Sequence, residues 1–281
     1  MTTLPLHSLP LFLENRLRHR VWWMHPILLF ILLQPIRPFA YITIGYLCFL
    51  ALKDYLSMIP THRMDRGSVL IAYFTIPLLI YWAATDRYGL YVIWIPLVVF
   101  LGICLSLYIR KKRFFFKDTI RPLVWGMIPF LFGLGHLVLI MVTPREVAPP
   151  LSQNGNVLYL VVLVQFAIFV SLARDLFLRP FKGPPMFTWT SALGIGLITA
   201  VFSAIIVPLF IVLPLSYALV IGASVGTAVF TAQGFVQMLQ ESVRIPIHWR
   251  TVQGHGGILL QIAGYTLSAP IYFHLIRLAF L

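Results

Sequence analysis

The chain has 281 residues, of which 60% are hydrophobic and 10% are charged, and its formal net charge is +13. A mean hydropathy of +0.91 is typical of a protein that lies largely within a lipid bilayer. This composition excludes an ordinary water-soluble protein and leaves no room for a separate soluble domain.

Long apolar runs follow one another along the chain and are separated by short breaks. Because lipid offers no hydrogen-bonding partner to the backbone, each run is expected to form a helix. The sequence therefore predicts an all-α, polytopic integral membrane protein with about nine transmembrane helices. The predicted helices are Val21–Leu33, Phe39–Leu52, Val69–Ala84, Leu90–Ile109, Leu123–Val142, Val157–Leu172, Thr190–Leu213, Tyr217–Met238 and Ile258–Leu281.

Residues 1–20 contain two prolines and a basic cluster, and they precede the first apolar run. That run has no small-residue cleavage site, so we interpret it as a retained span and not as a cleaved signal peptide. We therefore expect an N-terminal segment at 1–20 and a single membrane-embedded domain at 21–281.

Basic residues are concentrated in alternate breaks between the predicted helices. The breaks after the even-numbered helices contain Lys53, Arg63, Arg66, Arg110, Lys111, Lys112, Arg113, Lys117, Arg121, Arg174, Arg179, Lys182, Arg244 and Arg250. The positive-inside rule then predicts that these breaks and the N-terminus are cytoplasmic. Charge on one side is expected to attract anionic lipid head groups, and it accounts for the net charge without nucleic acid as a partner.

A glycine-rich stretch precedes the last apolar run and contains Gly254, His255, Gly256 and Gly257. Glycines let the backbone approach a ligand closely, and the first N–H groups of a helix favour an anion. The stretch is therefore a candidate phosphate-binding site at the membrane boundary. A sharp turn before a membrane helix is the alternative.

This stretch resembles the C-terminal signature of the phosphatidate cytidylyltransferase (CDP-diacylglycerol synthase) family. In one-letter code the signature reads P-G-H-G-G, an apolar residue, any residue, and D-R-x-D. The segment from Gly254 to Ile258 matches it. Leu260, Gln261, Ile262 and Ala263 hold the places of D-R-x-D, so both signature aspartates are missing.

A second stretch carries the resemblance across most of the chain. Residues Ala51–Ser57 and Pro60–Arg66 resemble a segment of a bacterial branch of the family, A-L-K-E/D-Y/F-L-S followed by P-T-R-R-x-D-R. By its composition alone, this stretch is also typical of a self-neutralising loop with exposed ion pairs. The resemblance implies a bacterial inner (cytoplasmic) membrane protein.

Two further family landmarks are present only in part. Of the S-P-x-K-T-W motif before the seventh predicted helix, Pro185, Thr188 and Trp189 match, while Phe187 replaces the lysine. A G-D pair in the eighth helix corresponds to Gly226–Thr227 or to Thr231, and neither choice is acidic.

The resemblance implies Mg²⁺-dependent transfer of a cytidylyl group from CTP to phosphatidate, in which carboxylates hold the metal. Those carboxylates are missing here, and Glu241 is the only acid that we nominate as a metal ligand. One helical face carries Gln233, Gln237 and Glu241. This face either lines a substrate cleft or packs against other helices through hydrogen bonds. No catalytic residue is assigned. The candidate phosphate- or lipid-binding residues are Gly254, His255, Gly256, Gly257, Arg244, Arg250, Thr188, Gln233 and Gln237.

None of the eight histidines has the spacing of a zinc or haem site. His136 and His274 lie within predicted spans, and we expect them to be hydrogen-bonded packing residues.

Two functions remain open at this point, besides a transporter, which we rank last. One is an enzyme of CDP-diacylglycerol metabolism, weak or inactive because the metal-binding aspartates are missing. The other is a catalytically degenerate scaffold or partner subunit that binds a lipid or a nucleotide. The expected partners are the bilayer, a phosphatidate-like phospholipid, CTP, and a second copy of the chain or another membrane protein.

Overall fold

The computed structural model describes residues 37–59, 64–111, 116–142, 155–178, 188–245 and 257–279. Every regular element in these ranges is a helix. Eight helices, two of which contain an internal π-helical segment, are long and apolar enough to cross a membrane. The prediction of an all-α, multi-pass membrane protein is therefore confirmed for the described part of the chain.

The observed helices correspond to the predicted spans from Phe39–Leu52 onward. They are α3 (Arg37–Met58), α4 (Arg66–Ala84), α5 (Tyr88–Leu97) continued by η3 (Val98–Cys104) and α6 (Leu105–Ile109), α7 (Phe116–Gly126) continued by η5 (Met127–Gly133) and α8 (Leu134–Val142), α9 (Gly155–Leu178), α10 (Trp189–Phe210), α11 (Leu215–Ser242) and α12 (Gly257–Ala279). The predicted span Val21–Leu33 and the segment 1–20 lie outside the described residues.

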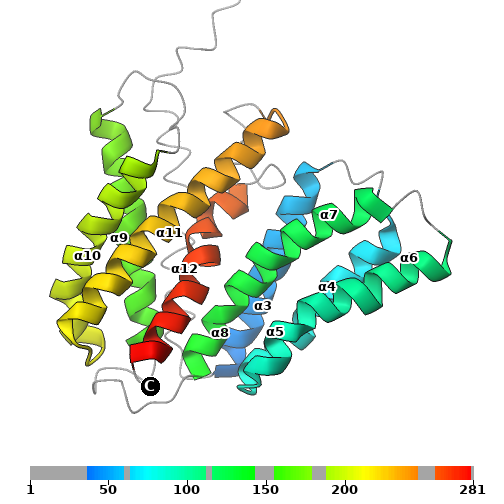
Figure 1. The fold of residues 1–281 in the computed structure, drawn as a ribbon, viewed down its shortest axis with the longest axis horizontal. Coiled ribbons are helices and arrows are strands. Elements are labelled where there is room, and N and C mark those ends of the chain that lie inside the picture. The colour runs from blue at the N-terminus through cyan, green and yellow to red at the C-terminus, as the bar shows by residue number, and fades with distance from the viewer. Residues whose placement is uncertain are drawn as a thin grey trace, which may run out of the picture.

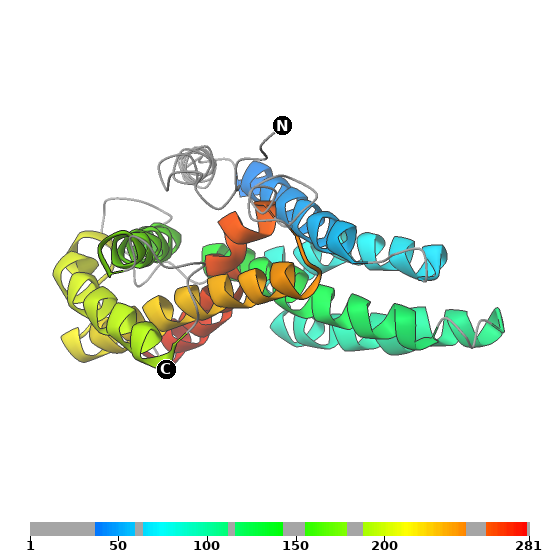
Figure 2. The ribbon, with the colours of Figure 1, turned by 90° about the horizontal axis from the view of Figure 1, so that it is seen from above.

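Helix α12 lies at the centre of the bundle. Figures 1 and 2 show α9, α10 and α11 on one side of it and the helices from α3 to α8 on the other. It contacts α11 and α9 on the first side, and α3, α8 and η5 on the second. Buried residues therefore lie all around this helix, as expected for a helix enclosed by others.

Consecutive spans are antiparallel, so alternate connections meet at the same end of the bundle. The ends of α3, α6, α9 and α11 and the beginnings of α4, α7, α10 and α12 lie along the upper and right-hand side of the bundle in Figure 1. We call this the basic end because it carries Lys53, Arg66, Arg110, Lys117, Arg121, Arg174 and Arg244. The expected segregation of charge is thus present in the described part of the chain.

Glycines allow α10 and α11 to pack closely. A Cβ atom added to Gly222 would lie 2.5 Å from the Ser203 Cβ and 2.7 Å from the Ala200 Cα. One turn further along α11, a Cβ on Gly226 would lie 2.6 Å from the Thr199 Oγ1. The Ser203 hydroxyl donates a hydrogen bond across this interface to the Ala218 carbonyl, at 2.5 Å. Small residues four apart are the usual means of close helix packing in membranes.

Prolines accompany the two π-helical segments. Pro96 lies two residues before the first residue of η3, and Pro129 lies within η5. Proline has no N–H group to continue the α-helical hydrogen bonds, and π-helical turns and prolines are common causes of helix bending. At the end of η5, a Cβ on Gly133 would lie 2.2 Å from the Thr266 carbonyl oxygen, so this segment lies directly against the backbone of α12.

We expect Gly222→Ala to destabilise the protein by about 1–3 kcal/mol, because the added methyl group overpacks the contact between α10 and α11. The melting temperature of the detergent-purified protein measures this change. Gly194→Ala is the matched control, since a Cβ at this position on α10 has no atom within 4 Å. Equal melting temperatures for the two variants would contradict the close contact.

Candidate functional site

The two stretches that carry the family resemblance meet at Asp54, in the last turns of α3. Asp54 is 2% exposed. Its Oδ2 atom accepts hydrogen bonds from the backbone N–H groups of Ile258 and Leu259, at 2.9 and 3.2 Å. The first N–H groups of a helix have no partner within the helix, and a negative charge there is stabilised by the helix dipole. Asp54 thereby holds the beginning of α12 against the end of α3.

This contact changes the interpretation of the glycine-rich stretch. The sequence left two interpretations open for the beginning of the last helix, a phosphate-binding site and a sharp turn before a membrane helix. In the structure, a buried carboxylate of the same chain accepts two of the N–H groups of that helix. Gly254, His255 and Gly256 lie outside the described residues, so their role as phosphate ligands stays a prediction.

Asp65, the second acid in residues 51–66, connects α4, α6 and α7 at the basic end. Asp65 is the N-cap of α4, and its Oδ2 accepts hydrogen bonds from the Ser68 N–H and hydroxyl groups, at 2.9 and 3.0 Å. Its own N–H group donates to the Thr119 Oγ1 on α7, at 3.0 Å. The Arg110 Nη1, beyond α6, lies 3.5 Å from the carboxylate.

The expectation of exposed ion pairs is therefore wrong for the two acids of this stretch. Both carboxylates are buried, and each has a partner from a distant part of the chain, Ile258 for Asp54 and Arg110 for Asp65. A buried carboxylate with several donors is a structural clamp, because removal of the acceptor leaves those donors unsatisfied.

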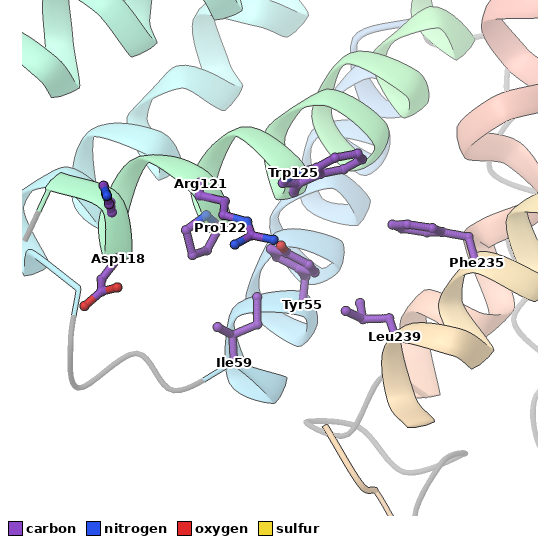
Figure 3. Close-up of a pocket in the computed structure, with 9 residues that line it drawn as sticks. Tyr55, Ile59, Asp118, Arg121, Pro122, Trp125, Phe235 and Leu239 are labelled. Carbon is purple, nitrogen blue, oxygen red and sulfur yellow. The ribbon is translucent and has the colours of Figure 1, made fainter. Parts of the chain in front are cut away.

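A pocket of about 450 Å³ lies at the basic end, between α3, α7 and α11. Its lining residues are Tyr55, Ile59, Lys117, Asp118, Arg121, Pro122, Trp125, Phe235 and Leu239. Figure 3 shows Arg121 directed toward Tyr55, with Trp125 and Phe235 facing each other across the opening. The Trp125 and Phe235 rings are nearly parallel, with centroids 6.4 Å apart.

The pocket combines an apolar wall with two cations. Lys117 and Arg121 lie in the first turns of α7, where the chain enters the membrane span, and Trp125 lies one turn deeper. Gly126 allows the Tyr55 ring to lie against α7, because a Cβ there would be 2.7 Å from that ring. Such a site fits an anionic amphiphile, with its phosphate near the cations and its acyl chains along the aromatic residues.

The pocket lies on a different face of α11 from the one nominated from the sequence. Phe235 and Leu239 line it, whereas Gln233, Gln237 and Glu241 are not among its lining residues. Residues two positions apart on a helix point in directions that differ by roughly 200°. Gln233 and Gln237 are half-buried and Glu241 is exposed, and their role toward a substrate stays a prediction.

The other nominated residues have local roles or lie outside the description. Thr188 is the N-cap residue of α10, and its Oγ1 lies 2.6 Å from the Ser191 hydroxyl. Arg244 follows α11 with a φ of 57°, and its N–H donates to the Glu241 carbonyl at 2.9 Å. Arg250 lies outside the described residues.

The positions of the family's aspartates are occupied here by packing residues. Ala263 is fully buried on α12, and Leu260 lies three residues before it on the same helix. The Thr227 hydroxyl donates to the Ala223 carbonyl at 2.8 Å, and the Thr231 hydroxyl to the Thr227 carbonyl at 2.8 Å. Within the described residues no three His, Cys, Asp or Glu side chains are grouped to hold a metal ion. A Mg²⁺ ion at the family's positions does not fit these side chains.

The aromatic wall of the pocket could not be identified from the sequence. Its residues come from three helices, and each is an ordinary apolar residue of a membrane span. Lys117 and Arg121 were noticed only as members of a basic break. The one signal in the sequence is that Tyr55 directly follows Asp54 in the family-like stretch.

Comparison with known proteins gives one informative similarity. The chain is 25% identical over 272 residues to the uncharacterized protein YnbB of Escherichia coli (strain K12), in an alignment that covers 94% of this chain and 88% of YnbB. No protein-family model matches the chain, and no solved structure matches it significantly. The name of YnbB assigns no activity, so a function has to be inferred from the site.

We expect Asp54→Ala to lower the free energy of unfolding by about 1–3 kcal/mol, because two buried N–H groups lose their acceptor. Asp54→Asn keeps an acceptor oxygen and should lose less. Thermal melting of the purified protein in detergent compares the variants with Lys53→Ala, which removes the exposed neighbouring side chain. Asp54→Ala and Lys53→Ala proteins of equal stability would show that the carboxylate does not hold α12.

Proposed function

We propose that the protein is a phosphatidate cytidylyltransferase-like membrane protein of phospholipid metabolism that binds an anionic phospholipid in the pocket between α3, α7 and α11. The observation that carries this proposal is the contact of the two family-like stretches at Asp54, directly beside Tyr55 in the wall of the pocket. Two distant segments that resemble the same family are thus neighbours in space.

The pocket supplies the interactions that a phosphatidate-like lipid requires. The guanidinium group of Arg121 and the ammonium group of Lys117 bind the phosphate, and Trp125, Phe235 and Leu239 contact the acyl chains. Each basic residue near an anionic membrane surface contributes about 1 kcal/mol. In this proposal the basic end faces the cytoplasm of a bacterial inner membrane, the N-terminus is cytoplasmic, and the full chain has about nine spans.

Transfer of a cytidylyl group is weak or absent in this proposal. The reaction brings two anions together and needs divalent cations held by carboxylates. At the family's positions the described residues provide alanine, leucine and threonine, so no step of that mechanism can be derived from this chain.

A degenerate scaffold or partner subunit is the second candidate. The residues Thr227, Leu260 and Ala263 favour it, because they cannot hold a metal ion and Ala263 is fully buried in the bundle. In this role the pocket presents a lipid or a nucleotide to another protein chain. That chain is either a second copy of this protein or a different membrane protein.

Lipid binding tests the proposal directly. We expect the purified protein to bind phosphatidate more tightly than phosphatidylcholine, and the double variant Lys117→Gln/Arg121→Gln to lose about tenfold or more in phosphatidate affinity. The double variant Arg66→Gln/Arg244→Gln removes two exposed cations of the same end that do not line the pocket, and it serves as the control. Equal losses in both double variants would contradict a pocket at Lys117 and Arg121.

An activity assay separates the two candidates. Incorporation of labelled CTP into lipid is measured with phosphatidate and Mg²⁺, with Glu241→Ala alongside. We expect little or no turnover, because the carboxylates are missing. Robust turnover that Glu241→Ala abolishes would show that this acid holds the metal and that the protein is an enzyme. No turnover, together with retained phosphatidate binding, supports the scaffold.

A further inference from the structure

A cluster of histidines and tyrosines lies near the end of the bundle opposite the basic end. We call it the histidine cluster. It consists of Tyr88 on α5, His136 on α8 and His274 on α12, with Tyr91 and Phe273 packed around them. The His136 and His274 ring centroids are 6.0 Å apart. Polar, ionisable groups within a membrane bundle are costly and commonly mark a functional site.

The hydrogen bonds of His136 determine which of its nitrogens carries the proton. The Nδ1 atom lies 2.8 Å from the Phe132 carbonyl oxygen. A carbonyl oxygen only accepts hydrogen bonds, so Nδ1 must be the donor and Nε2 holds a lone pair. This assignment follows from the hydrogen-bond geometry.

The Nε2 atom of His136 contributes no hydrogen bond to the packing of the bundle. His136 is fully buried, and its Nε2 has no hydrogen-bond partner among the described residues. A buried nitrogen that accepts no proton and no hydrogen bond is unfavourable. Histidines that bind a metal are held in this way, with one ring N–H donated to a backbone carbonyl and the other nitrogen directed at the ion.

The distances in the cluster are close to those of ligands that share one ion. Zinc-bound imidazole nitrogens lie about 2.0–2.1 Å from the metal, so two ring centroids on one tetrahedral ion are separated by roughly 5 Å. The observed separation for His136 and His274 is 6.0 Å, so the rings have to approach each other by about 1 Å to share an ion. The Tyr88 hydroxyl is hydrogen-bonded to the His274 Nε2 at 3.1 Å, and the two ligand atoms of a tetrahedral ion lie roughly 3.4 Å apart.

The surrounding residues determine how an ion reaches the site and which charges it meets there. His274 is exposed and Tyr88 is half-buried at the beginning of its helix, so an ion can enter from the surface of the bundle. The Arg277 guanidinium lies 5.5 Å from the centre of the Tyr88 ring. This charge repels a dication, whereas coordination by the ion removes the Tyr88 hydroxyl proton to solvent, and the resulting phenolate offsets one positive charge of the ion.

We propose that the histidine cluster binds one late first-row transition-metal ion of the Zn²⁺ or Cu²⁺ class through His136 Nε2, His274 Nε2 and the Tyr88 oxygen. Imidazole nitrogens favour these metals over Mg²⁺ and Ca²⁺. The site is independent of the lipid pocket, which lies at the other end of the bundle. It was not expected from the sequence, because its ligands come from three separate helices.

Metal titration of the full, untagged protein in detergent tests the proposal, with Zn²⁺ alone and Cu²⁺ alone as probes. We expect one ion per chain, and at least a 100-fold loss of affinity in His274→Phe and in His136→Phe. Tyr88→Phe removes a single oxygen and should weaken binding about tenfold or more. The spectrum of the Cu²⁺ form should show nitrogen ligands and lose its tyrosinate charge-transfer band in Tyr88→Phe.

Tyr46→Phe is the matched control for Tyr88→Phe, since it removes the same oxygen from an exposed tyrosine of α3 that is not part of the histidine cluster. His274 is exposed, so His274→Phe tests the site even if His136→Phe fails to fold. Size-exclusion profiles show which variants remain folded. The proposal would be overturned if the unaltered protein bound the ion no better than His274→Phe does, or if Tyr46→Phe lost as much affinity as Tyr88→Phe.

Discussion

The buried contact between Asp54 and the first N–H groups of α12 connects the first described helix with the last. Helix α12 lies between two groups of helices, so the position of its first turn affects both. A carboxylate is well suited to this contact, because it accepts more than one hydrogen bond and its charge opposes the positive end of the helix dipole. Tyr55, the next residue, forms part of the pocket wall. One turn of α3 thus positions the central helix and contributes to the site.

The residues that replace the family's aspartates serve close packing. Helices α10 and α11 approach each other at Gly222 and Gly226, and the threonine hydroxyls of α11 bond to carbonyls of their own helix. A carboxylate that holds a metal needs further carboxylates or imidazoles beside it, and the described residues group no three such side chains. The binding function that we propose therefore uses a different place, at the membrane boundary, where cations can meet a lipid phosphate without leaving their aqueous surroundings.

The two proposed sites share one membrane span and use its opposite ends. The span formed by α7, η5 and α8 carries Arg121 and Trp125 near its beginning and His136 near its end. Between them, Gly133 brings η5 against the backbone of α12. The lipid pocket depends on the basic end of this span, and the histidine cluster depends on the carbonyl of Phe132 in the π-helical segment, which orients the His136 ring.

The sequence alone determined the class of the protein and the course of its spans. Apolar runs of spanning length can form only helices in a bilayer, and alternate basic breaks must gather at one end when consecutive helices are antiparallel. These features depend on local composition and chain order. The sequence also marked Asp54 and Asp65 as unusual, although it assigned them to an exposed loop.

Only the tertiary structure decided what the polar side chains contact. The Ile258 partner of Asp54 lies 204 residues away, and Asp65 contacts Thr119 on α7 and Arg110 after α6 besides Ser68 on its own helix. Periodicity placed Gln233, Gln237 and Glu241 on one face of α11, but the pocket formed on another face, where Phe235 and Leu239 line it together with residues of α3 and α7. His136 and His274 gave no metal spacing for the same reason. Their approach depends on how helices pack across the bundle, and local spacing contains no information about that packing.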